Sequence, residues 1–547
     1  MTLPVTPRQA VDAWVNERLE PYLTEVGQAG FEVRVERPRQ PENGDFALNL
    51  AMQLAGRLKQ PPMELARAIA AYLSAAGPVG SVEVAAPGFI NLRLDHGWLV
   101  RQVEAVVAAG ADWGRGDFGG GRTVQVEFVS ANPTGPLLFS HGRGAVVGDT
   151  VARLLAFTGH QVQREFYVND AGRQVLLFAD SLVAARRGEP PPEDGYAGEY
   201  IQDLAATIPE ALLLGSADEV RLAVRDWGIE HYLSGFRGTL EALGITFDSW
   251  FSEKVLYGDW ERETLAADGV RQVISEHDGA TWMRFPDGKE DVLYKSSGAG
   301  TYFLGDLLYH RDKLVRRGFD LAIDVWGADH QNQVRRLKQA VTMLGVDADR
   351  LAIIIIQLVR MKAAGEFVKI SKRAGNLILL ADLVEEVGPD AVRYHYLLRS
   401  ADAPMDFDLD LAREQSNENP VFYAQYAHAR MCSVLAVGEE EGSRPSPVAL
   451  ERLVTDTERA LLGELMAFPD LVEDAARKME PHRLPHYAQG LAERIHAFYH
   501  AGNKDPQLRV LTPDAELSGA RLYLCLAARH TMANALGLMG VAAPNRM

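Results

Sequence analysis

Residues 124–157 read VQVEFVSANPTGPLLFSHGRGAVVGDTVARLLAF, and this stretch decides the fold. Its first six residues have the pattern of a strand, and the residues after Gly144 have the apolar spacing of a helix. The loop between them is neither the G-x-G-x-x-G of dinucleotide-binding domains nor a P-loop. Strand, Gly- and Pro-containing loop and helix together predict a ligand site at the carboxyl end of the strand.

The same alternation continues on both sides of a long mixed segment. QVQREFYV (161–168), LAIDVW (321–326) and LAIIIIQLV (351–359) are strand-like, and helical patterns follow the first two. Strands that alternate with helices predict an α/β fold with a doubly wound parallel sheet. We expect this domain to span residues 120–380, with an inserted domain at about 190–295.

Two further domains flank the predicted sheet. Residues 1–112 mix amphipathic helix with short strands, which predicts a small N-terminal α/β domain, and the Gly-rich GRGDFGGGR (114–122) is typical of a linker. Beyond about residue 380 the strand patterns stop. We therefore expect residues 381–547 to form an all-α domain.

Composition bounds the class of protein. With 547 residues, 47% hydrophobic and 24% charged, the chain is long enough for three ordinary globular domains. The N-terminus lacks a basic stretch followed by an apolar core, and the longest apolar run, LAIIII, is too short to cross a bilayer. Only Cys432 and Cys525 occur, without metal-like spacing. We expect a cytoplasmic protein with reduced thiols and no membrane partner.

The net charge of −18 argues against a general nucleic-acid binder, because phosphate binding needs Lys and Arg. It leaves room for a local basic groove, and an acidic remainder would suppress non-specific RNA binding by repulsion. The same sign suits a small cationic substrate.

The loop at 132–144 offers the groups that an anion needs. The following helix presents unpaired N–H groups at its N-terminus, and prolines and glycines stiffen the turn and allow close backbone approach. His141 can donate a hydrogen bond to a phosphate oxygen. An ordinary loop with a helix-capping histidine explains this segment equally well, so the segment alone leaves both interpretations open.

A second loop, GEFVKISKRAGN (365–376), follows the last strand-like run. Lys369, Lys372 and Arg373 lie between two glycines, an arrangement suited to a clamp for polyphosphate. A solvated basic loop is the common alternative, and the presence of the first loop makes the clamp the better interpretation.

These two loops carry a family resemblance. NPTGPLLFSHGRGAVVGD resembles the first signature of class I aminoacyl-tRNA synthetases, and VKISKRAGN resembles their second, KMSK signature. VEFVSANPTGPL, REFYVNDAGRQ, VWGADHQNQVRRLK, NPVFYAQYAHAR and the terminal LGLMGVAAPNRM resemble the arginyl-tRNA synthetase family in order and at suitable distances, and GDFALNLAMQLA and PGFINLRL resemble its extra N-terminal domain. The resemblance covers essentially the whole chain and implies a Rossmann-type catalytic domain.

The resemblance also implies roles for particular residues. The implied catalytic residues are His141, Lys369 and Lys372. The implied ATP-binding residues are Pro136, Leu138, Ser140, His141, Gly142, Gly144, Lys369, Ser371 and Lys372. The implied arginine-binding residues are Glu127 and Asp306 around the guanidinium, Ser130 and Asn132 toward the α-amino and carboxylate end, Tyr302 alongside, and Asp329 and His330 at a neighbouring strand end.

A guanidinium needs carboxylates in a fork geometry, which is chemistry that Glu127 and Asp306 can supply. On spacing alone, both would more often be surface or capping acids, and Asp329 would serve as well as a helix cap. The family resemblance is what favours the arginine pocket.

In the helical tail, the resemblance implies an anticodon-binding domain. Tyr423 and Tyr426 lie three apart on one predicted helix face, where their rings can stack on unpaired bases. Arg430 lies one turn further on, within reach of phosphate, and Met547 resembles the terminal Met of the family. Packing of both tyrosines in a helical core is the alternative.

One departure concerns the first signature. Family members commonly have His-x-Gly-His where this chain has Leu138, Phe139, Ser140 and His141, so one imidazole is lost. Losing a single transition-state donor typically lowers the rate by ~10²–10³. Two further departures, the KSSG at 295–298 and Gly305 before Asp306, have no explanation in the sequence.

We expect an active ligase that uses ATP with Mg²⁺, bound mainly through the ATP phosphates, to join L-arginine to the arginine tRNA, as a monomer. No metal site formed by protein side chains is expected. The main alternative is a paralogue that binds tRNA or arginine and has lost aminoacylation. An adenylate-forming ligase that uses no tRNA would not need the long helical tail.

Overall fold

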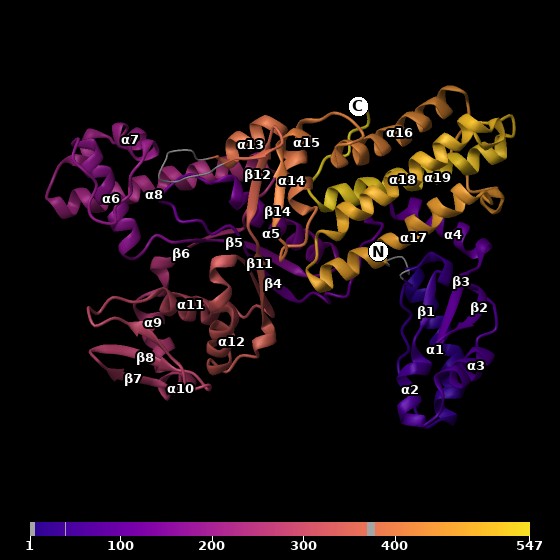
Figure 1. Ribbon diagram of the computed structural model, residues 1–547, viewed down its shortest axis with the longest axis horizontal. Helices are drawn as coiled ribbons and strands as arrows, with labels where there is room; N and C mark the ends of the chain where they lie inside the picture. The colour runs from indigo at the N-terminus through magenta and orange to yellow at the C-terminus, as the bar shows by residue number, and fades with distance from the viewer. Residues whose placement is uncertain (1–5, 39, 369–377) are drawn as a thin grey trace.

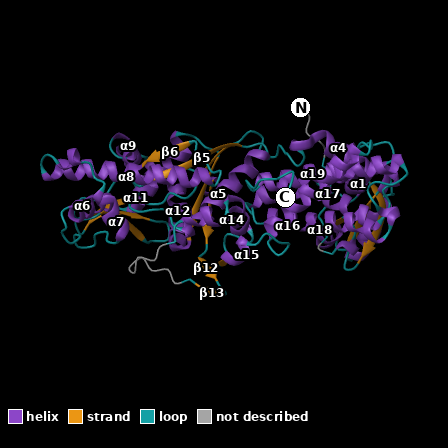
Figure 2. Ribbon diagram, turned by 90° about the horizontal axis from the view of Figure 1, so that it is seen from above, coloured by secondary structure: helices purple, strands orange, loops and turns teal. Residues whose placement is uncertain are grey.

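The computed structural model describes residues 6–38, 40–368 and 378–547. A central sheet lies between two inserted units on one side and a helical domain on the other, and the N-terminal domain packs beneath the helices (Figure 1). Seen from above, the molecule is elongated, with the sheet near its middle (Figure 2). No helix in the described ranges is both long and apolar enough to span a membrane.

The N-terminal domain is a three-stranded antiparallel sheet covered by helices. The strands lie in the order β1-β3-β2. Its first helix begins at a capping box, in which Thr6 Oγ1 accepts from Gln9 N at 3.2 Å, with Pro7 at the first position. The elements are α1 (Pro7–Glu25), β1 (Phe46–Leu48), α2 (Leu50–Leu58), α3 (Pro62–Tyr72), β2 (Val79–Ala85) and β3 (Phe89–Leu94), and α4 (His96–Ala109) leads away from the domain.

The central sheet confirms the predicted fold class. Five parallel strands lie in the order β11-β10-β4-β5-β6, so the chain reverses direction across the sheet between β4 and β10. Ligands bind at the carboxyl ends of the strands near such a reversal. The strands are β4 (Thr123–Glu127), β5 (Gln161–Val168), β6 (Ser249–Ser252), β10 (Leu321–Gly327) and β11 (Leu351–Ile356), and the associated helices are α5 (Phe139–Phe157), α11 (Tyr302–Arg311) and α12 (Val334–Met343).

The insertion expected as one segment at about 190–295 is divided by strand β6, which pairs with β5 in the central sheet. β6 has only four residues, SWFS, too few to show a period in the sequence. The first inserted unit contains α6 (Arg173–Arg186), α7 (Glu199–Ala206) and α8 (Ala217–Ala242). The second contains α9 (Asp259–Ala266), α10 (Asp268–Arg271), β7 (Ile274–His277), β8 (Ala280–Arg284) and β9 (Glu290–Tyr294).

The prediction that strands stop near residue 380 is wrong. Strand β14 (Met405–Asp408) pairs in parallel with β12 (Val359–Ala363), so part of the expected helical tail belongs to a second small sheet. Its pattern, MDFD, is again only four residues long. The remaining elements near it are β13 (Glu366–Phe367), α13 (Leu380–Val387), α14 (Pro389–Leu397) and α15 (Leu409–Arg413).

From residue 420 onward the tail is helical, as expected. Four long helices pack together, and α16 contacts both α18 and α19. They are α16 (Pro420–Glu440), α17 (Asp456–Lys478), α18 (Arg483–Lys504) and α19 (Ala515–Leu538). The short turns are η1 (Pro41–Asn43), η2 (Gly110–Asp112), η3 (Glu210–Leu213), η4 (Glu253–Leu256), the π-helical η5 (Asp312–Arg316), η6 (Ala328–Gln333), η7 (Ala348–Arg350), η9 (Leu450–Arg452) and η10 (Pro506–Leu508).

Candidate active site

A cavity of about 400 Å³ opens at the carboxyl ends of β4, β10 and β11. Beside it the backbone leaves β4 through two consecutive left-handed residues, Val129 (φ 69°) and Ser130 (φ 39°). A β-branched residue in this region is strained, and such strain is concentrated at functional sites. The lining residues are Val129, Ser140, His141, Gly144, Val325, Trp326, Gly327, Ala328, Asp329, Ile356, Gln357, Leu358 and Val359.

Four of the predicted site residues line this cavity: Ser140, His141, Gly144 and Asp329. Pro136, Leu138 and Gly142 do not. At Gly142 an added Cβ would lie 2.7 Å from Leu380 Cδ1 and 2.8 Å from Tyr396 Cε2, so this glycine allows helix α5 to pack tightly.

The ring of His141 is oriented by the backbone. The Leu138 N–H donates to His141 Nδ1 at 2.9 Å. An amide N–H can only donate, so Nδ1 is the unprotonated nitrogen and the neutral ring carries its proton on Nε2. His141 can therefore donate from Nε2, and this orientation does not depend on the side chain at position 138.

The first signature loop is held against the segment that follows the second signature. Phe139 N donates to Ile378 O at 3.0 Å, and Leu380 N donates to Leu137 O at 2.9 Å. Leu138 forms an antiparallel bridge with Leu379. Lys369, Ser371 and Lys372 lie outside the described residues, but the chain that follows them runs beside the first signature.

Arg143 holds one of the residues that line the cavity, Gln357. The side chain is fully buried, and its guanidinium donates to Gln357 O at 2.9 Å and Ser400 O at 2.7 Å. Burial lowers the pKa of Arg143 to about 10, a value at which the group is still charged at neutral pH. The cation thus ties helix α5 to the end of β11.

A buried ionic cluster lies next to the cavity, where Glu127 of β4 is opposite Asp324 of β10. Lys313 Nζ donates to Glu127 Oε2 at 2.6 Å and to Asp324 Oδ1 at 2.7 Å, and Lys313 and Asp324 are fully buried. Ser130 Oγ donates to Glu127 Oε1 at 2.9 Å. Both oxygens of Glu127 therefore already accept hydrogen bonds from the protein.

His310 completes the cluster. Its Nε2 lies 2.6 Å from Asp324 Oδ2, and its Nδ1 lies 2.7 Å from Asp306 O. Lys313 and His310 together hold the pKa of Asp324 well below its usual range, although burial alone would raise it. Lys313 favours the charged form of both acids, although burial still leaves the pKa of Glu127 raised.

Asp306 differs from these acids because no ion pair or hydrogen bond holds its carboxylate among the described residues. Burial, together with the charges of Glu127 and Asp324, raises the pKa of Asp306 to about 7, against the opposing effect of His310. A cationic ligand would stabilise the ionised form of such an acid more than that of an acid already paired within the protein. Tyr302, one turn earlier on α11, is 70% exposed, and Asn132 is also exposed.

Asp329 and His330 lie in the turn η6 after β10 and are exposed. His330 Nε2 is 3.4 Å from Asp329 Oδ2, and His330 Nδ1 lies 3.1 Å from Gln333 Oε1. Asp329 lines the cavity, whereas His330 does not; His330 contacts Asp329 within the same turn.

Sequence reasoning missed Lys313, Asp324 and His310. The segment YHRDKLVRRG reads as an ordinary solvated helix, but its π-helical turn at Asp312–Arg316 directs Lys313 into the interior. One signal was present in the sequence: Asp324 lies in the middle of the buried strand LAIDVW, where an acid needs a partner.

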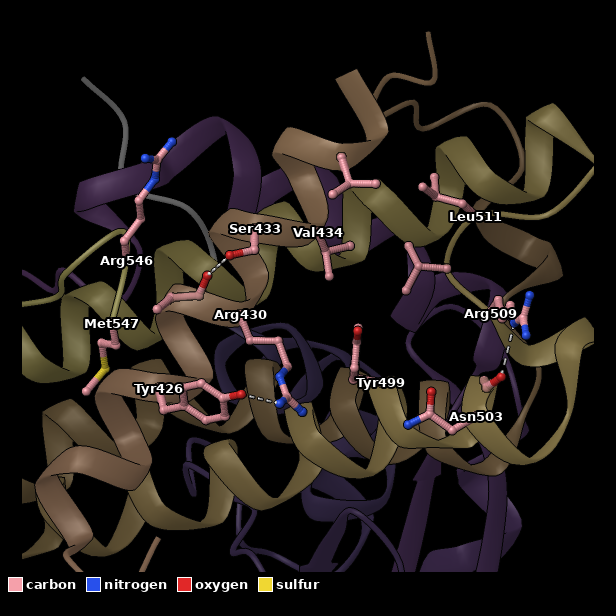
Figure 3. Close-up of a pocket in the computed structure, with 14 residues that line it drawn as sticks. Tyr426, Arg430, Ser433, Val434, Tyr499, Asn503, Arg509, Leu511, Arg546 and Met547 are labelled. Carbon is pink, nitrogen blue, oxygen red and sulfur yellow. Dashed lines mark hydrogen bonds between the residues drawn. The ribbon is translucent and has the colours of Figure 1, made fainter. Parts of the chain in front are cut away.

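The helical domain has a cavity of about 710 Å³ among α16, α18 and the chain end. Three predicted residues line it, namely Tyr426, Arg430 and Met547 (Figure 3). The Arg430 guanidinium lies 4.6 Å from the ring centres of both Tyr426 and Tyr499, and it donates to the Tyr426 hydroxyl at 2.7 Å. It has no carboxylate partner in the described part of the chain.

Tyr423 is placed differently from Tyr426. Its ring packs against His496 at 4.7 Å between centroids, and it does not line the cavity. The structure thus separates the two tyrosines: Tyr426 faces the cavity, and Tyr423 packs toward α18.

Comparison with known proteins agrees with this architecture. Residues 102–207 match the catalytic domain described as "tRNA synthetases class I (R)". The strand order, the cavity at the strand ends beside α5 and this match define a class I aminoacyl-tRNA synthetase.

The remaining matches are narrower. Residues 9–94 match the arginyl tRNA synthetase N terminal domain, and residues 424–547 match the DALR anticodon binding domain. The chain is 45% identical to the arginine–tRNA ligase of Desulforudis audaxviator over 94% of this chain and 93% of that one, and 44% identical to that of Bacillus licheniformis over 94% of each. It has the fold of Thermus thermophilus arginyl-tRNA synthetase, with a TM-score of 0.79 and 23% identity over 99% of this chain and 100% of that one. The chain belongs to the arginyl-tRNA synthetase family.

Proposed function

We propose that this protein is an arginine–tRNA ligase. It activates L-arginine with ATP and transfers the arginyl group to the 3′ end of the arginine tRNA. Two observations carry the proposal: the cavity at the carboxyl ends of the strands, which Ser140, His141 and Gly144 of the first signature line, and the acid Asp306, which has no cation among the described residues. The relatives named as arginine–tRNA ligases, which match over nearly the whole chain, support it.

In the first step, a carboxylate oxygen of arginine attacks the α-phosphorus of ATP, and the bond to the bridging oxygen breaks to release pyrophosphate. Catalysis is positioning plus stabilisation of charge, without a protein nucleophile. In this proposal the Nε2–H of His141 and the N-terminus of α5 donate to the phosphate region, and the orientation of the His141 ring supports this role. Lys369 and Lys372, with Ser371, act as the phosphate clamp in this proposal. Mg²⁺ enters with the ATP phosphates.

For the amino acid, we propose that Asp306 receives the guanidinium, with Tyr302 at the mouth of the pocket. Glu127, already neutralised by Lys313, forms the base of the pocket. Ser130 and Asn132 face the α-amino and carboxylate groups of the bound arginine in this proposal. The turn with Asp329 and His330 borders the same pocket.

In the second step, the terminal ribose hydroxyl of the tRNA attacks the activated carbonyl, and AMP leaves. We propose that Tyr426, Arg430 and Met547 read the anticodon loop at the helical cavity, with Tyr423 supporting α16. Aromatic rings and an unneutralised guanidinium are the groups that bind unstacked bases and phosphates. The enzyme acts as a monomer in the cytoplasm in this proposal.

The altered first signature leaves the contacts of the neighbouring residues in place. The loop is held by backbone hydrogen bonds, His141 is oriented by an amide, and Leu138 does not line the cavity. These contacts favour an active enzyme over a paralogue that has lost catalysis.

The test is arginine-dependent ATP–pyrophosphate exchange, with and without the arginine tRNA, on the wild type, on Leu138→His and on His141→Ala. We expect activity in the wild type, little gain from Leu138→His, and a loss of about 10²–10³ from His141→Ala. A wild type that is inactive under every condition but recovers with Leu138→His would refute the proposal.

A further inference from the structure

Residues 539–547, which we call the terminal segment, follow α19 and form neither helix nor strand. Such a segment has no hydrogen-bond ladder of its own, so its backbone groups need partners from other elements. Met539 and Val541 are buried, whereas Met547 is 51% exposed and lines the cavity of the helical domain. The terminal segment thus leads from the core to the cavity.

Helix α14 fixes the start of the terminal segment through Arg393. This side chain is fully buried, and it donates from Nε to Met539 O at 2.6 Å and from Nη1 to Leu243 O at 2.9 Å. It also forms an ion pair with Asp149 of α5, the helix of the first signature. Gly540 has a φ of 67°, and an added Cβ would lie 2.5 Å from Arg393 Cζ, so a larger residue would displace this cation.

One turn earlier on α14, Asp390 fixes the middle of the terminal segment. Its Oδ1 accepts from Ala542 N at 3.0 Å, and its Oδ2 accepts from Gln425 Nε2 of α16 at 2.8 Å. The same Gln425 amide donates to Ala542 O at 2.9 Å. Both backbone groups of Ala542 are therefore held, and one carboxylate joins α14, α16 and the terminal segment.

The last part of the terminal segment lies along one face of α16. His428 is buried, and its Nδ1 donates to Pro544 O at 2.9 Å. Cys432 Sγ lies 3.5 Å from Asn545 Oδ1. Residues 425, 428 and 432 are three and four positions apart, so they share one face of the helix.

The neighbouring face of α16 lines the cavity. Residues 426, 430, 433 and 437 have the same helical spacing, and all four line it. Because the terminal segment follows the face beside them, its last two residues, Arg546 and Met547, reach the cavity next to Tyr426 (Figure 3).

Ordering an irregular segment costs conformational entropy. Arg546 and Met547 bury little in return, since both are exposed. The contacts of Asp390, Gln425 and His428 therefore stabilise a position whose benefit lies in what the cavity binds.

We propose that Asp390 is a positioning residue for reading of the anticodon: through Ala542 and Gln425 it sets the place of Arg546 and Met547 in the cavity. The inference rests on the proposed binding of the anticodon loop at this cavity. It adds to that site a residue of α14, a helix that also holds α5 of the catalytic domain through Arg393.

The test is a double-mutant cycle of Asp390→Ala and Met547→Ala in the full chain. Dissociation constants are measured for a transcript of the arginine tRNA and for the same transcript with its anticodon bases replaced. Each single variant should bind the arginine transcript about tenfold more weakly and bind the altered transcript nearly as the wild type does. The double variant should lose no more than the larger of the two single losses, because Asp390 acts through the segment that carries Met547.

The matched control is Asp382→Ala, because Asp382 is an exposed acid in the first turn of α13, as Asp390 is in the first turn of α14. It should bind both transcripts as the wild type does, and thermal unfolding of every variant separates binding from stability. Asp390→Asn keeps an acceptor for Ala542 N and should retain most of the affinity. If Asp390→Ala does not fold, Gln425→Leu takes its place in the cycle, since it removes the amide that joins Asp390 to Ala542.

Losses that add in the double variant would overturn the inference and leave the proposed function intact. So would a folded variant of the cycle at position 390 or 425 that distinguishes the two transcripts as well as the wild type does. A wild type that binds both transcripts equally would instead refute the proposed binding of the anticodon loop.

Discussion

The catalytic domain and the helical domain hold a key cation in opposite ways. In the catalytic domain, Lys313 is fully buried between Glu127 and Asp324. In the helical domain, Arg430 lies between the rings of Tyr426 and Tyr499 and has no acid partner among the described residues. Carboxylates neutralise a cation, whereas aromatic faces hold it in place and leave its charge available. The first arrangement suits a pocket whose ligand is itself a cation, and the second suits a surface whose ligand is an anion.

The largest effect should come from removing the neutralised cation. Lys313→Met removes the cation that two buried acids share, so we expect the free energy of unfolding to fall by about 3–5 kcal/mol. Urea denaturation at neutral pH measures it, with the exposed Lys289→Met as the control. A loss below about 1 kcal/mol would mean that the Lys313 ion pairs contribute little, as exposed pairs do.

The unneutralised cation should matter for RNA and much less for stability. Arg430→Met should weaken binding of the arginine tRNA by about 10- to 100-fold and lower the salt dependence of binding by about one unit of slope. Titrations at several salt concentrations measure both, and the KM for arginine should stay the same. Arg262→Met, which removes an exposed ion pair with Asp259, is the control. Equal tRNA affinity in both variants would remove the contrast between the two domains.

The acid without a cation predicts a pH dependence. Burial raises the pKa of Asp306 from an ordinary 3.8 to about 7, so the free site holds a proton below that pH. A guanidinium needs the carboxylate, so the KM for arginine should rise about tenfold between pH 8 and pH 6. Asp306→Asn should bind weakly with no such dependence. The stability of the unliganded protein changes in the opposite direction. Between about pH 4 and pH 7, Asp306 is ionised in the unfolded chain but protonated in the folded one, so its contribution to the free energy of unfolding falls as the pH rises.

The smallest effect belongs to the hydroxyl that holds Arg430. Tyr426→Phe keeps the ring beneath the guanidinium but removes the 2.7 Å hydrogen bond. We expect tRNA binding to weaken only a few-fold, in line with about 0.5–1.5 kcal/mol for one such bond. A loss as large as that of Arg430→Met would show that the ring alone does not place the guanidinium.

Regular patterns were predictable from the sequence, and irregular ones were not. The strand, loop and helix around His141 follow from periodicity. The alternation of strands and helices along the chain, which predicts the parallel sheet, follows from it too. The four-residue strands β6 and β14 are too short to show a period. Lys313 was not predictable because a single π-helical turn decides whether it faces solvent or the interior.

The backbone pairing between residues 137–139 and 378–380 has a consequence for how such an enzyme can evolve. Amide and carbonyl groups, which every residue type except proline supplies in full, carry the register of the two loops. With Leu138 where the family usually has His, these backbone contacts are formed and the Leu138 N–H still holds His141. A lineage can lose that side chain in one mutational step, remain folded with His141 still aimed, and restore the lost rate elsewhere afterwards.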